Sequence, residues 1–141
     1  MTRLTILLFT LLLSSVGYAE QQIAKGTWTK IDYDAAGTWS ITKEDGKLIV
    51  SLSDDFETKD GPDLFILFST KKLSEVNNSN ANQSSIQVGM LKTNDKSLFF
   101  KKMKGAQRFE LPGDTDLSKY QSILIHCVQF SHLWAGAELN N

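Results

Sequence analysis

The stretch Ser122-Ile-Leu-Ile-His-Cys-Val-Gln-Phe-Ser-His-Leu-Trp134 decides how the rest of the sequence is interpreted. It contains the only cysteine of the chain, Cys127, and both of its histidines, His126 and His132. Its apolar and β-branched residues predict a strand buried in or beside a core. The first question is therefore whether these reactive side chains form a site or only pack.

Strand geometry separates the three reactive side chains, because side chains alternate between the two faces of a strand. If the whole stretch is one strand, Cys127 continues an aliphatic row with Ile123 and Ile125, and both histidines lie on the other face. His132 then lies roughly 16 Å along the strand from Cys127, at about 3.3 Å per residue. Only a bend or a β-bulge would change this separation.

This separation argues against several kinds of site. A mononuclear copper site needs a second histidine beside the cysteine and usually an axial methionine, and a zinc site needs three or four suitably spaced ligands. A nucleophilic cysteine needs a base within reach. We therefore expect no metal site and no hydrolase. Haem ligation needs no local spacing motif, so it stays open, and the simplest alternative is that Cys127 is a small buried hydrophobe.

Short strand-forming segments alternate with turn signals along the rest of the chain. Leu64 to Phe68 is apolar on both faces, which is typical of a strand inside a fold. Glu44-Asp-Gly46 predicts a hairpin loop, and Asp114 or Asp116 is the expected N-cap of one helical turn before Tyr120. With no long amphipathic helix, we predict an all-β, single-domain antiparallel β-sandwich of about seven to nine short strands.

Residues 74–85 differ from the other connections. The segment is dense in Asn and Ser and low in apolar residues. This composition predicts an exposed, mobile loop.

The first nineteen residues predict export. Arg3 precedes an apolar run from Leu4 to Leu13, and Gly17 and Ala19 stand three and one residues before the expected cleavage site. The run is shorter than the about 20 apolar residues of a membrane span. We expect a signal peptide over 1–19 and one mature domain over 20–141, without a membrane span, in the periplasm or outside the cell.

The charge balance bears on partners. The chain has 15 basic and 16 acidic side chains, and loss of Arg3 with the signal peptide leaves 14 against 16, a net charge of −2. A nucleic-acid partner would require a basic surface. We therefore expect no nucleic-acid partner.

Eight short segments, taken together, follow a known family pattern. They are Gly37–Ile41, Asp55–Phe56, Gly61–Leu64, Val88–Lys92, Gly105–Pro112, Asp116–Tyr120, Ser122–Phe130 and Ala137–Leu139. In order and spacing, the mature chain resembles the DM13 electron-transfer domain of exported and cell-surface proteins.

The resemblance implies a β-sandwich and a role in electron transfer. The characteristic cysteine of the family matches Cys127, and it is proposed to act as a bare redox thiol or as a ligand of a prosthetic group such as haem. His126 stands where the family typically has Trp, and His132 stands where a small apolar residue is expected. Each histidine is either an additional ligand of the prosthetic group or a change in the surroundings of the cysteine. His126, next to Cys127 in the sequence, is the nearer candidate for a ligand.

Two functions from different classes remain. The first is an exported redox domain, not a stand-alone enzyme, which uses Cys127 with a redox protein partner such as a cytochrome or a haem-binding domain. The second is a non-catalytic extracytoplasmic binding or adhesion module, in which Cys127 is core packing and the loops are the contact surface.

Overall fold

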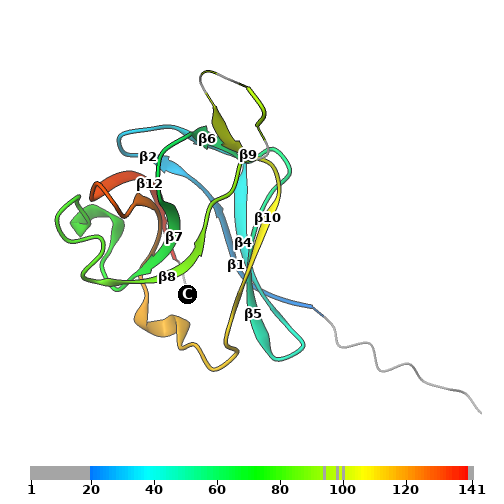
Figure 1. Ribbon diagram of the computed structural model, residues 1–141. Helices are drawn as coiled ribbons and strands as arrows, with labels where there is room; N and C mark the ends of the chain where they lie inside the picture. Colours follow the sequence, from blue (N-terminus) through cyan, green and yellow to red (C-terminus); the bar gives the residue numbers. More distant parts are fainter. Residues whose placement is uncertain (1–19, 94, 98, 100, 140–141) are drawn as a thin grey trace, which may run out of the picture.

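The computed structural model describes residues 20–93, 95–97, 99 and 101–139, which form antiparallel strands and two 3₁₀ turns without an α-helix (Figure 1). The predicted signal peptide lies outside the described residues. The predicted all-β class is confirmed, and two packed sheets fit the predicted sandwich. Within the described part of the chain, no helix is long and apolar enough to cross a membrane.

The first sheet has four strands in the order β1-β4-β5-β10. Their bounds are Gln21–Thr27 for β1, Thr38–Glu44 for β4, Lys47–Leu52 for β5 and Gln107–Leu111 for β10. The hairpin between β4 and β5 turns at Asp45 and Gly46, which have φ angles of 46° and 76°. Asp-Gly suits two consecutive positive φ angles, so the predicted hairpin is confirmed.

The second sheet has five strands in the order β2-β12-β11-β7-β8 and holds the reactive residues. Their bounds are Thr29–Lys30 for β2, Leu64–Ser69 for β7, Ser85–Met90 for β8, Ser122–Cys127 for β11 and His132–Glu138 for β12. The middle strand is β11, and all six of its residues are buried. The strand predicted from Leu64 to Phe68 is β7, its neighbour.

The main core fills the space between these two sheets. Trp39, Ile41 and Val50 come from the first sheet, and Ile66 and Ile125 come from the second. Full burial of an aliphatic or aromatic side chain of this kind contributes about 1.5–3 kcal/mol. Cys127 belongs to the same cluster.

A small third sheet and a 3₁₀ turn complete the sandwich, at the top and bottom of Figure 1. The sheet contains β3 (Ala35–Ala36), β6 (Glu57–Lys59) and β9 (Lys102–Lys104), and the turn η2 spans Leu117–Lys119. Asp116 caps η2 by accepting a hydrogen bond from the Ser118 amide at 3.1 Å, which confirms the predicted cap. The described residues form twelve strands rather than the predicted seven to nine, because strands of two or three residues are too short to show alternation in the sequence.

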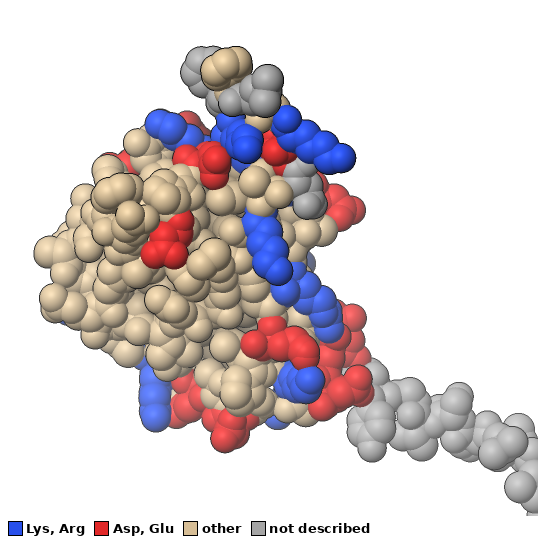
Figure 2. All heavy atoms as spheres, in the orientation of Figure 1, with Lys and Arg blue, Asp and Glu red and all other residues tan. Residues whose placement is uncertain are grey.

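The Asn- and Ser-rich segment is packed rather than only exposed. It includes the 3₁₀ turn η1 (Leu73–Glu75) and lies on the outer face of the five-stranded sheet, where Ala81 is 0% exposed. Asn77 Oδ1 accepts hydrogen bonds from the amides of Ser79 and Asn80 at 3.0 and 3.1 Å. These bonds satisfy the loop's own backbone and allow the loop to pack on the sheet. The prediction of an exposed loop is thus wrong for Ala81, which packs against Leu67 and Leu124. The side of the molecule that this loop forms carries few charges (Figure 2).

The stretch from Ser122 to Trp134 is not one strand. The chain turns back after Cys127, and β12 begins at His132. The turn contains no Gly, Pro, Asn or Asp, and Ser131 takes a φ angle of 48°. The prediction of a continuous strand is wrong because the usual hairpin residues are missing.

Candidate functional site

Cys127 lies at the end of β11 and inside the main core. Its side chain is 0% exposed and continues the row of Ile123 and Ile125. The thiol donates a hydrogen bond to the carbonyl oxygen of Pro62, with 2.8 Å between Sγ and O. The loop before β7 therefore closes over the sulfur and satisfies its only donor.

The hairpin brings His132 directly opposite Cys127. The two residues are cross-strand partners in the β11–β12 register, and the Cβ atoms of such partners lie about 4.5–5.5 Å apart. The predicted separation along one strand is therefore wrong. His132 is 40% exposed, and its Nε2 lies 2.6 Å from Oδ2 of Asp32.

A β-bulge turns Trp134 into the main core. Ile125 pairs with Ala135, but His126 pairs with Leu133, so Trp134 is the extra residue of β12. The indole is 6% exposed, and its Nε1–H donates to the carbonyl oxygen of Lys59 at 3.2 Å.

Gly61 leaves space for this indole. A Cβ atom at Gly61 would lie 2.8 Å from Cζ2 of Trp134, which is too close for ordinary packing. The segment from Lys59 to Pro62 therefore contacts both the indole and the sulfur of Cys127.

A tight turn after β2 adds Asp32 and Tyr33 to this group. The amides of Ile31, Asp32 and Tyr33 all donate to the carbonyl oxygen of Trp134, at 3.2, 3.0 and 3.1 Å. This wraps the turn around β12 at the bulge. It explains why Asp32 meets the histidine of β12 and why Tyr33 lies against Trp134.

The aromatic rings form a continuous group that reaches the surface. The centroids of Tyr33 and Trp134 are 4.4 Å apart, and the His132 ring lies 5.5 Å from Trp134 and 5.9 Å from Tyr33. The Lys59 ammonium lies 4.4 Å from the centroid of the Tyr33 ring, a distance that gives a favourable cation–π interaction. We call Tyr33, Trp134 and His132 the aromatic cluster.

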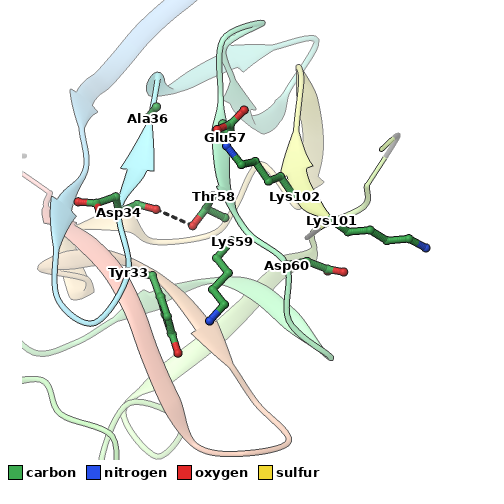
Figure 3. Close-up of a pocket in the computed structure, with 9 residues that line it drawn as sticks. All are labelled: Tyr33, Asp34, Ala36, Glu57, Thr58, Lys59, Asp60, Lys101 and Lys102. Carbon is green, nitrogen blue, oxygen red and sulfur yellow. Dashed lines mark hydrogen bonds and ion pairs between the residues drawn. The ribbon is translucent and has the colours of Figure 1, made fainter. Parts of the chain in front are cut away.

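A cavity of about 550 Å³ opens beside the Tyr33 end of this cluster (Figure 3). It is lined by Tyr33, Asp34, Ala36, Glu57, Thr58, Lys59, Asp60, Lys101 and Lys102. The third sheet supplies most of this wall. Its position is held by an ion pair between Lys102 and Glu57 and by a hydrogen bond of 2.8 Å from the Thr58 hydroxyl to the carbonyl oxygen of Asp34.

His126 lies on the opposite face of the sheet from Cys127, as alternation predicts. It is 0% exposed, and its cross-strand partners are Phe65 and Leu133. Both partners belong to the apolar packing under the Asn- and Ser-rich segment. Among the described residues, neither ring nitrogen has a hydrogen-bond partner. Burial lowers the pKa of His126 to about 4, and the charge of His132 acts in the same direction.

Haem ligation does not fit these two side chains. An axial ligand must present its donor atom to an open face of the haem. The Cys127 sulfur is fully enclosed and bonded to Pro62, and both nitrogens of His126 are covered by apolar packing. Across the described part of the chain, no three His, Cys, Asp or Glu side chains are grouped so as to hold a metal ion.

Sequence reasoning proposed Cys127 as a site residue and did not predict the aromatic cluster. Its members come from two separate segments, and the β12 hairpin and bulge that join them carry no turn signal. The available clue was Gly61-Pro62, whose small and rigid residues allow close approach of other groups.

Comparison with known families gives one match. The sequence model of the family described as electron transfer DM13 matches residues 28–139. Searches of curated proteins and of solved structures gave no match. The matched range covers Cys127, the aromatic cluster and the cavity beside Tyr33.

Proposed function

The chain belongs to the electron transfer DM13 family, and we propose that it is an exported one-electron carrier in which Cys127 is the redox-active group. Family membership makes it an electron-transfer-related domain, and such a domain needs a redox partner. The observation that supports Cys127 is its position. An enclosed sulfur lies behind an aromatic cluster that reaches the surface.

The proposed route runs from the sulfur through Trp134 to Tyr33. The thiol and the indole N–H are bonded to the same segment, at Pro62 and Lys59. Tyr33 then lies between the indole and the surface cavity. Electron transfer needs no contact between the sulfur and an external reagent, so burial of Cys127 agrees with this function and disagrees with nucleophilic chemistry.

The electron and the proton leave together in the proposed step. The Cys127 thiol gives one electron to the oxidised partner, and its proton leaves the hydrogen bond to the Pro62 carbonyl for the imidazole of His132, which leaves a sulfur-centred radical. Return of one electron and of that proton restores the thiol. His132 suits this role because it lies opposite Cys127 in the register, on the same face of the sheet, and because its Nε2 lies 2.6 Å from Asp32 Oδ2, which fixes the position of the ring.

We propose that the partner is a protein that carries its own redox cofactor, such as a cytochrome or a haem-binding domain. The partner then supplies the haem, and this chain supplies the cysteine and the aromatic route. The proposal therefore derives no step through haem bound to Cys127 or His126.

An oxidative titration tests the role of Cys127. The protein is titrated with the one-electron oxidant hexachloroiridate(IV), beside the Cys127→Ala and Cys127→Ser variants. We expect the wild-type protein to consume one more oxidising equivalent than either variant. Equal consumption by all three, with unchanged circular dichroism, would exclude Cys127 as the redox group.

One observation favours a second function, a binding module in which Cys127 only packs. The sulfur is 0% exposed and continues an aliphatic row, as expected of a small buried hydrophobe. In that case Cys127→Ala alters stability alone, and the titration gives equal consumption. The two functions are thus separated by the same experiment.

Export to the periplasm or the cell exterior is part of the proposal. The charged start, short apolar run and small residues of 1–19 support it. Expression with the native N-terminus in a secretion-competent host should give an exported protein whose first residue, by N-terminal sequencing, is Glu20. An uncleaved chain that remains in the cells would contradict export.

A further inference from the structure

We propose that the cavity beside Tyr33 binds a small aromatic anion. The inference rests on the proposed function in one respect, since a ligand there would lie at the surface end of the aromatic cluster. The binding itself depends only on the cavity. Its lining residues come from the turn after β2, from the third sheet, and from Asp60 and Lys101, which flank strands of that sheet.

The size of the cavity suits one small molecule. Its volume is about 550 Å³, within the range of roughly 300–1,000 Å³ that is usual for ligand pockets. Figure 3 shows Tyr33 and Lys59 on one side, Ala36 and Glu57 at the far end, and Asp60 and Lys101 at the rim. The cavity is therefore a recess between the third sheet and the aromatic cluster.

The charges of the lining favour an anion at Lys59. Glu57 is paired with Lys102, and Asp34 is paired with Lys30 at 3.2 Å. Among the described residues, Lys59 forms no ion pair within 4.0 Å, and its ammonium instead lies over the Tyr33 ring.

The rim adds no net charge to this balance. In Figure 3 the ammonium of Lys101 points outward from the cavity, and Asp60, whose amide donates to the Lys101 carbonyl oxygen at 3.3 Å, adds the opposite charge on the same side. The Lys59 ammonium is therefore left without a carboxylate on the Tyr33 side of the recess, where it can bind a sulfonate or a carboxylate.

The remaining surface favours an aromatic body over a bare inorganic anion. The Tyr33 ring packs against Trp134, and the same residue lines the cavity. Ala36 and the methylene groups of Lys59 and Lys102 add apolar surface, since long side chains present their stems as well as their charges. A flat ring with one acidic group matches this combination.

Isothermal titration calorimetry with anthraquinone-2-sulfonate tests the proposal. We expect one binding site, with weaker binding of both inorganic sulfate and the neutral 2-(hydroxymethyl)anthraquinone. Lys59→Gln should weaken binding of the sulfonate by about tenfold or more, because it removes a charged partner. Tyr33→Leu should also weaken it, and Lys43→Gln, on exposed β4 surface outside the cavity, should not.

Three results would overturn the proposal. They are absence of saturable binding, equal affinity for sulfate, and unchanged affinity in Lys59→Gln, a surface substitution that leaves the core intact. Cys127→Ala separates this inference from the proposed function. The variant should bind the sulfonate normally even though it lacks the redox group, so binding can succeed or fail independently of the oxidative titration.

Discussion

At the scale of single residues, the enclosure of Cys127 is the feature that most restricts its chemistry. The sulfur has no exposed surface and its proton is held by the Pro62 carbonyl. Reagents that must touch the sulfur are therefore excluded while the fold is intact. Electron transfer through the neighbouring aromatic rings has no such requirement.

The first prediction concerns the hydrogen bond to Pro62. Cys127→Ala removes the hydrogen bond to the Pro62 carbonyl and should lower the free energy of unfolding by about 0.5–1.5 kcal/mol. Cys127→Ser keeps a donor at the same place and should cost less. Urea unfolding of the three proteins measures this, and equal losses in the two variants would show that the hydrogen bond contributes nothing.

The second prediction concerns accessibility of the thiol. Ellman's reagent should react with Cys127 in urea but not with the native protein, because the folded state exposes none of the sulfur. The rate in native buffer should follow unfolding rather than reagent concentration. Fast stoichiometric reaction of the native protein would contradict the enclosed geometry.

The third prediction concerns pH and His126. Its pKa is lowered from 6.5 to about 4 in the folded protein, so the unfolded chain binds the extra proton first as pH falls. Stability is then complete above about pH 6.5 and decreases by about 3 kcal/mol between pH 6.5 and 4. Urea unfolding at pH 7 and at pH 4.5 measures this loss.

His126→Leu provides the control for that loss. It removes two buried nitrogens that have no hydrogen-bond partner among the described residues, and it fits the apolar surroundings of Phe65 and Leu133. The variant should be more stable than the wild type at pH 4.5 and should lose less stability on acidification. An unchanged pH dependence would mean that another group titrates.

At the scale of elements, the β11–β12 hairpin and the loop over it form one structural unit. Asn78 Oδ1 accepts a hydrogen bond from the Leu133 amide at 2.8 Å, next to the β-bulge. Ala81 of the same loop packs with Leu67 and Leu124. The loop thus closes the outer face of the sheet above His126.

The fourth prediction tests this closure. Asn78→Ala should cost about 1 kcal/mol and should speed hydrogen exchange at the Leu133 amide. Asn82→Ala, at an exposed position of the same loop, is the matched control and should change neither quantity. Unchanged exchange at Leu133 in Asn78→Ala would show that the loop does not hold the hairpin.

Prediction from the sequence succeeded where local chemistry determines the structure. Asp45 and Gly46 correctly predict the β4–β5 hairpin, and Asp116 correctly predicts the N-cap of η2. It failed at Val128 to Ser131, where tertiary contacts turn a chain that has no turn residues. Because of that single error, His132 was predicted on the strand face opposite Cys127, whereas the structure makes it the cross-strand partner of Cys127.

At the scale of the whole molecule, the sandwich separates a packed interior from one accessible end. The middle strand β11 carries Cys127 inward and His126 outward. The third sheet and the turn after β2 cover the end where the aromatic cluster meets the cavity. A redox partner would approach this end, since the proposed route emerges there.

The all-β class follows from the sequence, because alternation and turn signals are local. The assembly of Tyr33, Lys59 and Trp134 does not. These residues are far apart in the chain and meet through a bulge, a glycine contact and three amides that share one carbonyl oxygen. Such contacts exist only in the folded molecule.

The central claim is that electrons leave Cys127 through Trp134 and Tyr33. Freeze-quench electron paramagnetic resonance after addition of one equivalent of hexachloroiridate(IV) tests it most directly. We predict a short-lived aromatic radical in the wild-type protein and a longer-lived one in Cys127→Ala, which has no thiol to reduce it. Equal radical lifetimes in the two proteins would contradict the account.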